Sequence, residues 1–161
     1  MTPVRFAVDA RETVLRAAVA EAARRGDPYL GTEHLLLGLL ADPNGVAVRA
    51  LGVDVDEGRA ALDRLDGEAL GSIGIDPGLT VPGTGAPRRS RPPFTDGLRQ
   101  ALRRAVDGTT GGGERRITDR HLLLGIVSGE PPDAAALLLR ALGCDPAAIR
   151  ESLRSMGQRR D

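Results

Sequence analysis

The sequence predicts an all-α fold in which a four-helix unit occurs twice, giving about eight helices in tandem. Residues 31–40 read GTEHLLLGLL and residues 117–126 read ITDRHLLLGI, so the core HLLLG is present in two copies. The flanking segments recur in the same order, because RALGVD at residues 49–54 is matched by RALGCD at residues 140–145. The apolar alternation that is typical of strands does not extend over four or more residues anywhere in the chain.

The first unit is expected to contain four helices. Apolar residues at helical spacing predict the first over about residues 9–25, with Asp9 as its N-cap. Thr32 is expected to cap the second, which carries the leucines of the repeat and is apolar on nearly all sides, as a buried central helix would be. A short third helix is expected over residues 46–51 and a fourth over about residues 55–65.

The second unit repeats this plan. Thr95 is expected to cap its first helix, and Thr118 is expected to cap the second leucine-rich helix. A third helix is predicted to start at the Pro-Pro-Asp sequence of residues 131–133 and to end at Gly143. The fourth has Asp145 as N-cap and Pro146 at its first position.

Two segments are predicted to be loops. Residues 67–93 hold six Gly and five Pro in 27 positions, which is longer than the about 12–15 residues of an ordinary loop, so this segment is interpreted as a linker. The glycine-rich residues 108–113 are predicted to be a second flexible loop. The expected organisation is therefore a first repeat over residues 4–66, a linker over 67–93 and a second repeat over 94–156, with the two repeats packing as one domain.

Composition narrows the classes of function. The 22 basic residues, all of them Arg, balance 22 acidic residues among 161, which argues against a nucleic-acid or membrane-surface binder. Residues 1–20 carry charges through their apolar positions, so no signal peptide is expected, and no apolar run approaches the ~18 residues of a membrane span. With Cys144 as the one cysteine, a reducing cytoplasmic location is the expectation. A monomer is expected because the leucine-rich helices are predicted to be buried.

No catalytic or metal-binding constellation stands out. One Cys and two distant His residues do not provide the ligands of a metal site. A nucleophile elbow, a glycine-rich phosphate loop and a clustered carboxylate pair are all missing from the sequence. We therefore expect no catalytic residues, no metal and no cofactor, and a protein that is not an enzyme.

The chain resembles the Clp N-terminal domain, the duplicated Clp R repeat that precedes the ATPase modules of Clp/Hsp100 unfoldases such as ClpC. The resemblance rests on Arg5-Phe6, on Pro93-Phe94-Thr95, on GTEHLLLG and on the second HLLLG block. Because the sequence contains no Lys, it cannot contain a Walker A motif, and we expect a free-standing Clp-repeat protein without ATPase modules. The resemblance implies a module that binds Clp unfoldase or peptidase components, adaptors or substrate peptides.

Thr32 and Glu33 are candidates for a phosphoarginine or anion site. In the resembled family, the Thr-Glu pair at the start of the leucine-rich helix belongs to a phosphoarginine site. A helix N-terminus can bind phosphate, and a carboxylate can accept hydrogen bonds from a guanidinium. The alternative is that Thr32 is an N-cap and Glu33 a favourable first-turn acid. In the second copy, Arg120 occupies the position of Glu33.

Phe6, Arg11, Phe94 and Arg99 are candidates for a peptide or adaptor groove, since they occupy equivalent points of the two repeats. In the resembled family this region lies near a groove that binds adaptors and, in some members, cyclic peptide antibiotics. The alternative is that both Phe residues pack the start of each repeat. Two further functions stay open: a decoy that sequesters a cyclic peptide directed at ClpC, and a ligand-responsive regulator that reuses the helical scaffold.

Overall fold

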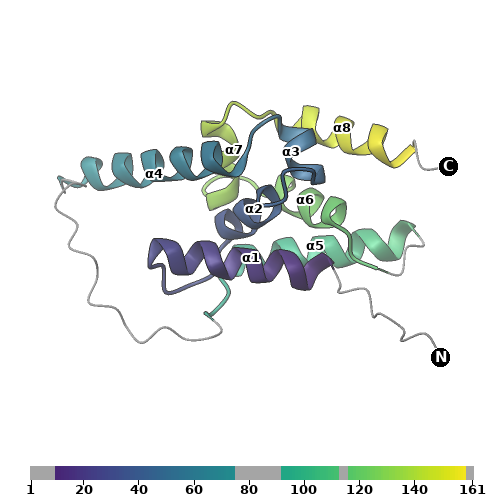
Figure 1. Cartoon of the computed structure of the whole chain (residues 1–161), viewed down its shortest axis with the longest axis horizontal. Coiled ribbons are helices and arrows are strands. Elements are labelled where there is room, and N and C mark those ends of the chain that lie inside the picture. Colours follow the sequence, from purple (N-terminus) through teal and green to yellow (C-terminus); the bar gives the residue numbers. More distant parts are fainter. Residues whose placement is uncertain (1–9, 75–91, 113–115, 159–161) are drawn as a thin grey trace.

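The structure is a computed structural model, and it describes residues 10–74, 92–112 and 116–158. The first repeat forms α1 (Ala10–Arg25), α2 (Thr32–Leu40), α3 (Val46–Leu51) and α4 (Val55–Ser72). The second repeat forms α5 (Asp96–Gly112), α6 (Asp119–Val127), α7 (Ala134–Ala141) and α8 (Pro146–Gln158). Within the described residues, the predicted all-α fold of two four-helix repeats is confirmed (Figure 1).

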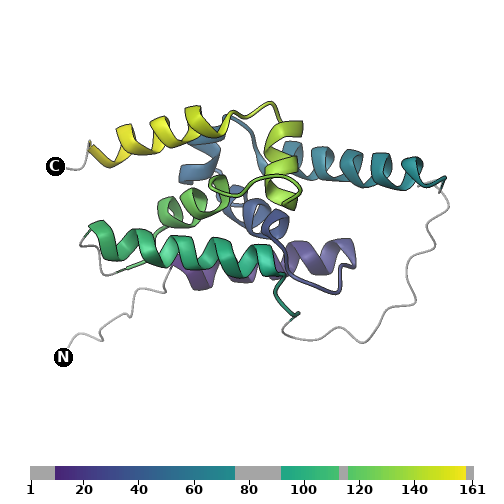
Figure 2. The same ribbon diagram turned by 180° about the vertical axis from the view of Figure 1, so that it is seen from behind.

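The two leucine-rich helices lie at the centre of the molecule. α2 and α6 are enclosed between a layer formed by α1 and α5 and an opposite layer that contains α3, α4, α7 and α8, as both views show (Figures 1 and 2). Every residue of α2 is buried, and α2 contacts α5, α6 and α7 of the other repeat as well as its own neighbours. The buried apolar residues of both repeats form a single cluster, so each repeat completes the core of the other.

The glycine of each HLLLG motif allows two helices to approach closely. A Cβ on Gly38 would lie 2.8 Å from the carbonyl oxygen of Val14 and 2.9 Å from the nitrogen of Ala18, both in α1. The equivalent Cβ on Gly125 would lie 2.4 Å from the carbonyl oxygen of Ala101 in α5. All three distances are shorter than van der Waals contact, so any side chain at these positions would push α1 from α2 or α5 from α6.

Histidine side chains complete the N-termini of the central helices. The N–H of Gly31 donates to Nδ1 of His34 at 3.0 Å, and the N–H of Thr118 donates to Nδ1 of His121 at the same distance. Gly31, with extended backbone, is the N-cap of α2, and Thr32 is the first helical residue. The prediction that Thr32 caps this helix is therefore wrong, whereas Thr118 is the N-cap of α6 as predicted.

Two helices are longer than predicted. α4 continues to Ser72 rather than ending near Leu65, so it includes residues 67–72 of the expected linker. α5 continues to Gly112 through most of the predicted loop at 108–113. An interior glycine costs a helix only about 1 kcal/mol relative to alanine, which helical neighbours can offset. The domain boundaries stay predictions; Asp9 and the linker residues 75–91 lie outside the described residues.

The two repeats are also joined through their backbones. Leu30 precedes α2 and Phe94 precedes α5, and the two residues form an isolated parallel bridge. The N–H of Leu30 donates to the carbonyl of Pro93, and the N–H of Thr95 donates to the carbonyl of Leu30, both at 2.9 Å. This bridge holds the start of α2 beside the start of α5.

We predict that Gly38→Ala and Gly125→Ala each destabilise the fold. Overpacking a tight helix contact costs about 1–3 kcal/mol. Chemical denaturation followed by circular dichroism would measure the change in free energy of unfolding. Gly71→Ala is the matched control, because a Cβ at this helical position meets no atom within 4 Å. That control should raise stability by about 0.5–1 kcal/mol. Equal effects at the three positions would contradict the packing argument.

Candidate functional site

A cleft of about 800 Å³ opens where the two repeats meet. The first repeat contributes Tyr29, Thr32 and Glu33, which lie just before and at the start of α2. The second repeat contributes the first turns of α5, including Arg104, and the segment 128–134 between α6 and α7. The cleft therefore exists only because the two repeats pack together.

Thr32 forms hydrogen bonds across this junction. Its hydroxyl donates to Oδ1 of Asp133 at 2.9 Å and accepts from the N–H of Ala135 at 3.1 Å. The other carboxylate oxygen of Asp133 accepts from the N–H of Ala136 at 3.1 Å, which caps α7. The hydroxyl of Thr32 thus connects the start of α2 to the start of α7.

Glu33 is buried and has no cationic partner among the residues that the structure describes. Its exposed fraction is 6%, and no side-chain donor among the described residues lies within hydrogen-bonding distance of its carboxylate. The ionisable nitrogen nearest to this carboxylate is Nδ1 of His34, which lies 3.7 Å from Oε1. That nitrogen already accepts a hydrogen bond from the N–H of Gly31. A Cβ on Gly31 would lie 2.2 Å from Oε2 of Glu33. Glycine at position 31 therefore makes room for this carboxylate, which lines the cleft.

The electrostatics of the cleft favour a positive ligand beside Glu33. Burial raises the pKa of Glu33, and the carboxylates of Asp27 and Asp133 act in the same direction. Burial, with Glu33 as the next cause, also raises the pKa of Tyr29 to about 12. Burial is the leading cause of both shifts, and the neighbouring carboxylates add to it. A guanidinium or ammonium placed beside Glu33 would supply a compensating positive charge.

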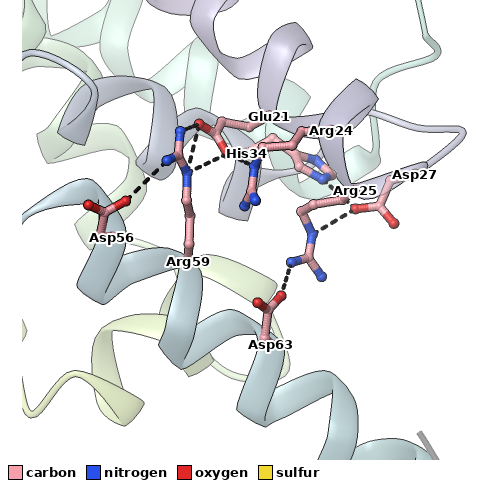
Figure 3. Close-up of polar contacts among 8 residues, drawn as sticks. All are labelled: Glu21, Arg24, Arg25, Asp27, His34, Asp56, Arg59 and Asp63. Atoms are coloured by element: carbon pink, nitrogen blue, oxygen red, sulfur yellow. Dashed lines mark hydrogen bonds and ion pairs between the residues drawn. The ribbon is translucent and has the colours of Figure 1, made fainter. Parts of the chain in front are cut away.

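A chain of polar contacts holds the segment that leads into α2 (Figure 3). Because Nδ1 of His34 is an acceptor, Nε2 carries the hydrogen and donates to Oδ2 of Asp27 at 2.7 Å. The same carboxylate oxygen accepts from Nε of Arg25 at 3.1 Å, and Arg25 also pairs with Asp63 at 2.7 Å and with Asp66 in α4. The hydrogen bond from His34 is the leading cause that lowers the pKa of Asp27.

A second contact in the same view fixes α1 to α4. Arg59 donates from Nη2 to Oε1 of the buried Glu21 at 2.5 Å and from Nε to both carboxylate oxygens at 3.2 Å (Figure 3). Burial acts to raise the pKa of Glu21, but the hydrogen bonds and charges of Arg59 and Arg24 outweigh it, and the pKa is lowered. Together with the contacts of Arg25 to Asp63 and Asp66, this pair joins the C-terminal part of α1 to α4.

Arg104 in α5 contributes a positive charge to the cleft. Nε of Arg104 donates to the carbonyl of Gly125 at 2.9 Å, which orients the side chain along the cleft wall. The cleft therefore combines the acidic groups Glu33, Glu130 and Asp133 with one guanidinium. Such a site can accept hydrogen bonds from a cationic group and can also place a positive charge beside an attached anion.

Sequence reasoning identified Thr32 and Glu33 but missed the partners that complete the cleft. Tyr29, Arg104, Glu130 and Asp133 lie in no shared motif. The sequence indicated Asp133 only as part of the start of a helix, and Glu130 directly precedes the Pro-Pro pair at residues 131–132. The signal that could have found them is the repeat itself, since a loop before the third helix of one unit meets the central helix of the other.

The second copy of the motif does not reproduce this arrangement. Arg120, at the position of Glu33, donates from Nε to the carbonyl of Leu153 at 3.1 Å and packs beside Gly157 in α8. Asp119, at the position of Thr32, lies near Asp42, and burial followed by this like charge raises the pKa of Asp119. Arg120 therefore serves the packing of α8.

The four residues of the predicted groove lie in different settings. Phe94 packs partly buried against the core, and Arg99 is exposed and pairs with Asp96 at 2.7 Å. Arg11 is exposed on the first turn of α1, and Phe6 lies outside the described residues. α1 and α5 run in opposite directions along their layer (Figures 1 and 2). The groove formed by these residues stays a prediction.

The described part of the chain holds neither a metal-binding cluster nor a helix that could cross a membrane. No group of three or more His, Cys, Asp or Glu residues there is placed to hold a metal ion. Among the same residues, no helix combines the length and the apolar composition that crossing a membrane requires.

Comparisons with known proteins find that the chain is similar to Clp proteins. Residues 6–76 match the Clp repeat (R) N-terminal domain. The chain is 35% identical over 144 residues to a probable ATP-dependent Clp protease ATP-binding subunit of Chlamydia pneumoniae, covering 87% of the chain and 15% of that protein. It is 29% identical over 149 residues to the chloroplastic chaperone protein ClpC2 of Oryza sativa subsp. japonica, covering 90% of the chain and 14% of that protein.

A solved structure has the same fold. The N-terminal domain of the caseinolytic protease associated chaperone ClpD from Arabidopsis thaliana superposes with a TM-score of 0.65 at 20% identity, covering 90% of this chain and 92% of that one. The chain thus spans nearly the whole of that domain. It spans only 14–15% of the length of the curated relatives it matches.

We predict that Thr32→Val destabilises the contact between α2 and α7. The substitution keeps the shape but leaves the buried N–H of Ala135 without an acceptor, which costs about 1–3 kcal/mol. Thr32→Ser retains the hydroxyl and is the control, with a smaller expected loss. Thermal and urea unfolding of both variants would measure the difference. Equal losses would show that the methyl group contributes as much as the hydroxyl, which would contradict this prediction.

Proposed function

The chain belongs to the Clp repeat (R) N-terminal domain family, and we propose that it is a non-enzymatic peptide-binding module of the Clp protease system. Its partners would be Clp unfoldase or peptidase components, adaptors, or the substrate peptides that they receive. The similarity to Clp protease subunits and ClpC-type chaperones supports this proposal. The lack of any Lys in the sequence, and hence of a Walker A motif, agrees with a module that does not itself hydrolyse ATP.

We propose that the cleft between the repeats is the binding site and that it binds an arginine side chain. The observation that carries this proposal is the Glu33 carboxylate, which is buried, faces the cleft and has no cationic partner among the described residues. A guanidinium could donate to Glu33 and lie against the ring of Tyr29, an arrangement that arginine favours. The bound side chain would replace the solvent that the carboxylate has lost.

The finer form of the proposal is that the arginine is phosphorylated, as a degradation mark. A phosphate on the guanidinium could interact with Arg104 and with the positive end of the α2 dipole. Both charges of such a ligand would then meet a complementary group. Because Arg120 replaces the carboxylate in the second copy and packs against α8, we expect one such site rather than two.

Calorimetric titration with a phosphoarginine peptide and its arginine counterpart would test this assignment. We expect about one equivalent to bind, and Glu33→Gln to weaken binding roughly tenfold to 100-fold, as the loss of a charge-assisted hydrogen bond does. Glu151→Gln on α8 is the control, because this exposed residue lies outside the cleft and should leave binding unchanged. Folding of each variant would be checked by its thermal unfolding.

The possible outcomes distinguish the binding of an arginine peptide from the recognition of a phosphorylated arginine. Binding of the arginine peptide alone would refute the role in reading a degradation mark and leave the peptide-binding role intact. Binding of both peptides with no effect of Glu33→Gln would move the site elsewhere on the chain. If neither peptide bound, the cleft would not be an arginine site.

The raised pKa of Glu33 generates a pH prediction. The folded state holds a proton on this carboxyl up to a higher pH than the unfolded state, so ionisation of Glu33 opposes folding above that raised pKa. The binding of a guanidinium requires the ionised form. The affinity for an acetylated arginine amide, which stays cationic throughout, should therefore fall as the pH decreases from 7.5 through the raised pKa. In Glu33→Gln the weak residual affinity should not change over this range, and a pH-independent wild type would contradict the role of Glu33.

A further inference from the structure

A second groove lies between α4 of the first repeat and α7 of the second. Its volume is about 370 Å³. Successive turns of α4 contribute Ala61, Arg64, Leu65 and Glu68, and successive turns of α7 contribute Leu137, Arg140 and Ala141. In each helix these residues are three or four positions apart, so they form one stripe on each side of the groove.

The floor of the groove is apolar and partly open to solvent. Ala61 is fully buried, Leu65 is half-buried, and Leu137 is 36% exposed, whereas Leu138 and Leu139, which follow it in α7, are buried. Two alanines on facing helices leave the space that larger side chains would fill. An apolar side chain of leucine size could therefore pack against Leu65 and Leu137.

Each side of the groove carries a guanidinium that has no counterion among the described residues. Neither Arg64 nor Arg140 forms an ion pair or hydrogen bond within the part of the chain that the structure describes. Most arginines in that part do have such a partner, as Arg25 has with three carboxylates and Arg104 has with a carbonyl. Glu68 also lines the groove, so its net formal charge is two positive minus one negative, or +1.

We propose that this groove binds an acidic peptide segment of a partner protein, in which one apolar side chain enters the floor and flanking carboxylates pair with Arg64 and Arg140. Charge complementarity selects this occupant, because a cation on each side can hold a carboxylate on either flank of the anchor. The first cleft has the opposite character, with three acidic groups and one arginine. The two sites therefore select ligands of opposite charge, and this proposal does not depend on the proposed function.

Fluorescence anisotropy with a designed probe would test the groove. The probe is a short fluorescein-labelled peptide with leucines and glutamates at helical spacing, and its counterpart carries lysine in place of every glutamate. We expect the glutamate peptide to bind the wild type and the lysine peptide to bind at least tenfold more weakly. The double variant Arg64→Glu/Arg140→Glu should reverse this preference, and Leu137→Ser should weaken binding of the glutamate peptide.

Matched controls separate the groove from general electrostatics. Arg49→Glu/Arg103→Glu makes the same change in net charge at two exposed arginines that line neither site, and it should retain the preference of the wild type. Glu33→Gln should also leave binding of the glutamate peptide unchanged. Amide shifts measured by NMR should occur at Ala61, Leu65 and Ala141 rather than around the first cleft.

Three results would overturn the proposal. The first is equal binding of the two peptides by the wild type. The second is a loss of binding in the control double variant as large as that in Arg64→Glu/Arg140→Glu. The third is a set of amide shifts confined to other surfaces. Circular dichroism of each variant would show that the fold is retained, so that a loss of binding reports on the groove itself.

Discussion

The complete burial of α2 is the constraint on which the rest of the molecule depends. A nine-residue helix that is apolar on all sides cannot be covered by its own repeat, so helices of the second repeat must pack against it. Burial extends to the N-terminus of the helix, where Thr32 and Glu33 carry polar groups. The hydroxyl of Thr32 is satisfied by the other repeat, and the carboxylate of Glu33 is left facing a cleft. The site is thus a consequence of how the core is closed.

The two repeats use one scaffold for different purposes. Each begins its central helix with a histidine that accepts from the N-cap N–H, and each has a glycine that allows close contact with the preceding helix. These shared features maintain the fold. The differences lie in the residues beside the N-cap, where Glu33 faces a cleft and Arg120 packs on α8. Duplication therefore supplied two equivalent positions, and only one of them retains an unpartnered carboxylate.

Much of the fold could be predicted because the decisive patterns are local. The leucine-rich helices, the cap at Thr118 and the start of α8 at Pro146 follow from spacing within a few residues. The role of Thr32 could not be predicted, because its hydrogen bonds go to Asp133 and Ala135, about a hundred positions along the chain. The burial of Glu33 has the same origin. The length of α4 was underestimated because glycines at positions 67 and 71 resemble a linker in composition but are tolerated within the helix.

The residue at position 31, before α2, restricts which side chain can occupy position 33, and comparison with the second repeat illustrates this. Gly31 has no side-chain oxygen with which to cap α2, and any larger residue would displace the carboxylate two positions later. In the second repeat, where no such carboxylate exists, the equivalent N-cap is Thr118. The two positions are therefore expected to vary together as the family diverges. Glycine with glutamate would mark a repeat that keeps the acidic cleft, and a hydroxyl residue with a bulky cation would mark one in which helix capping has replaced it.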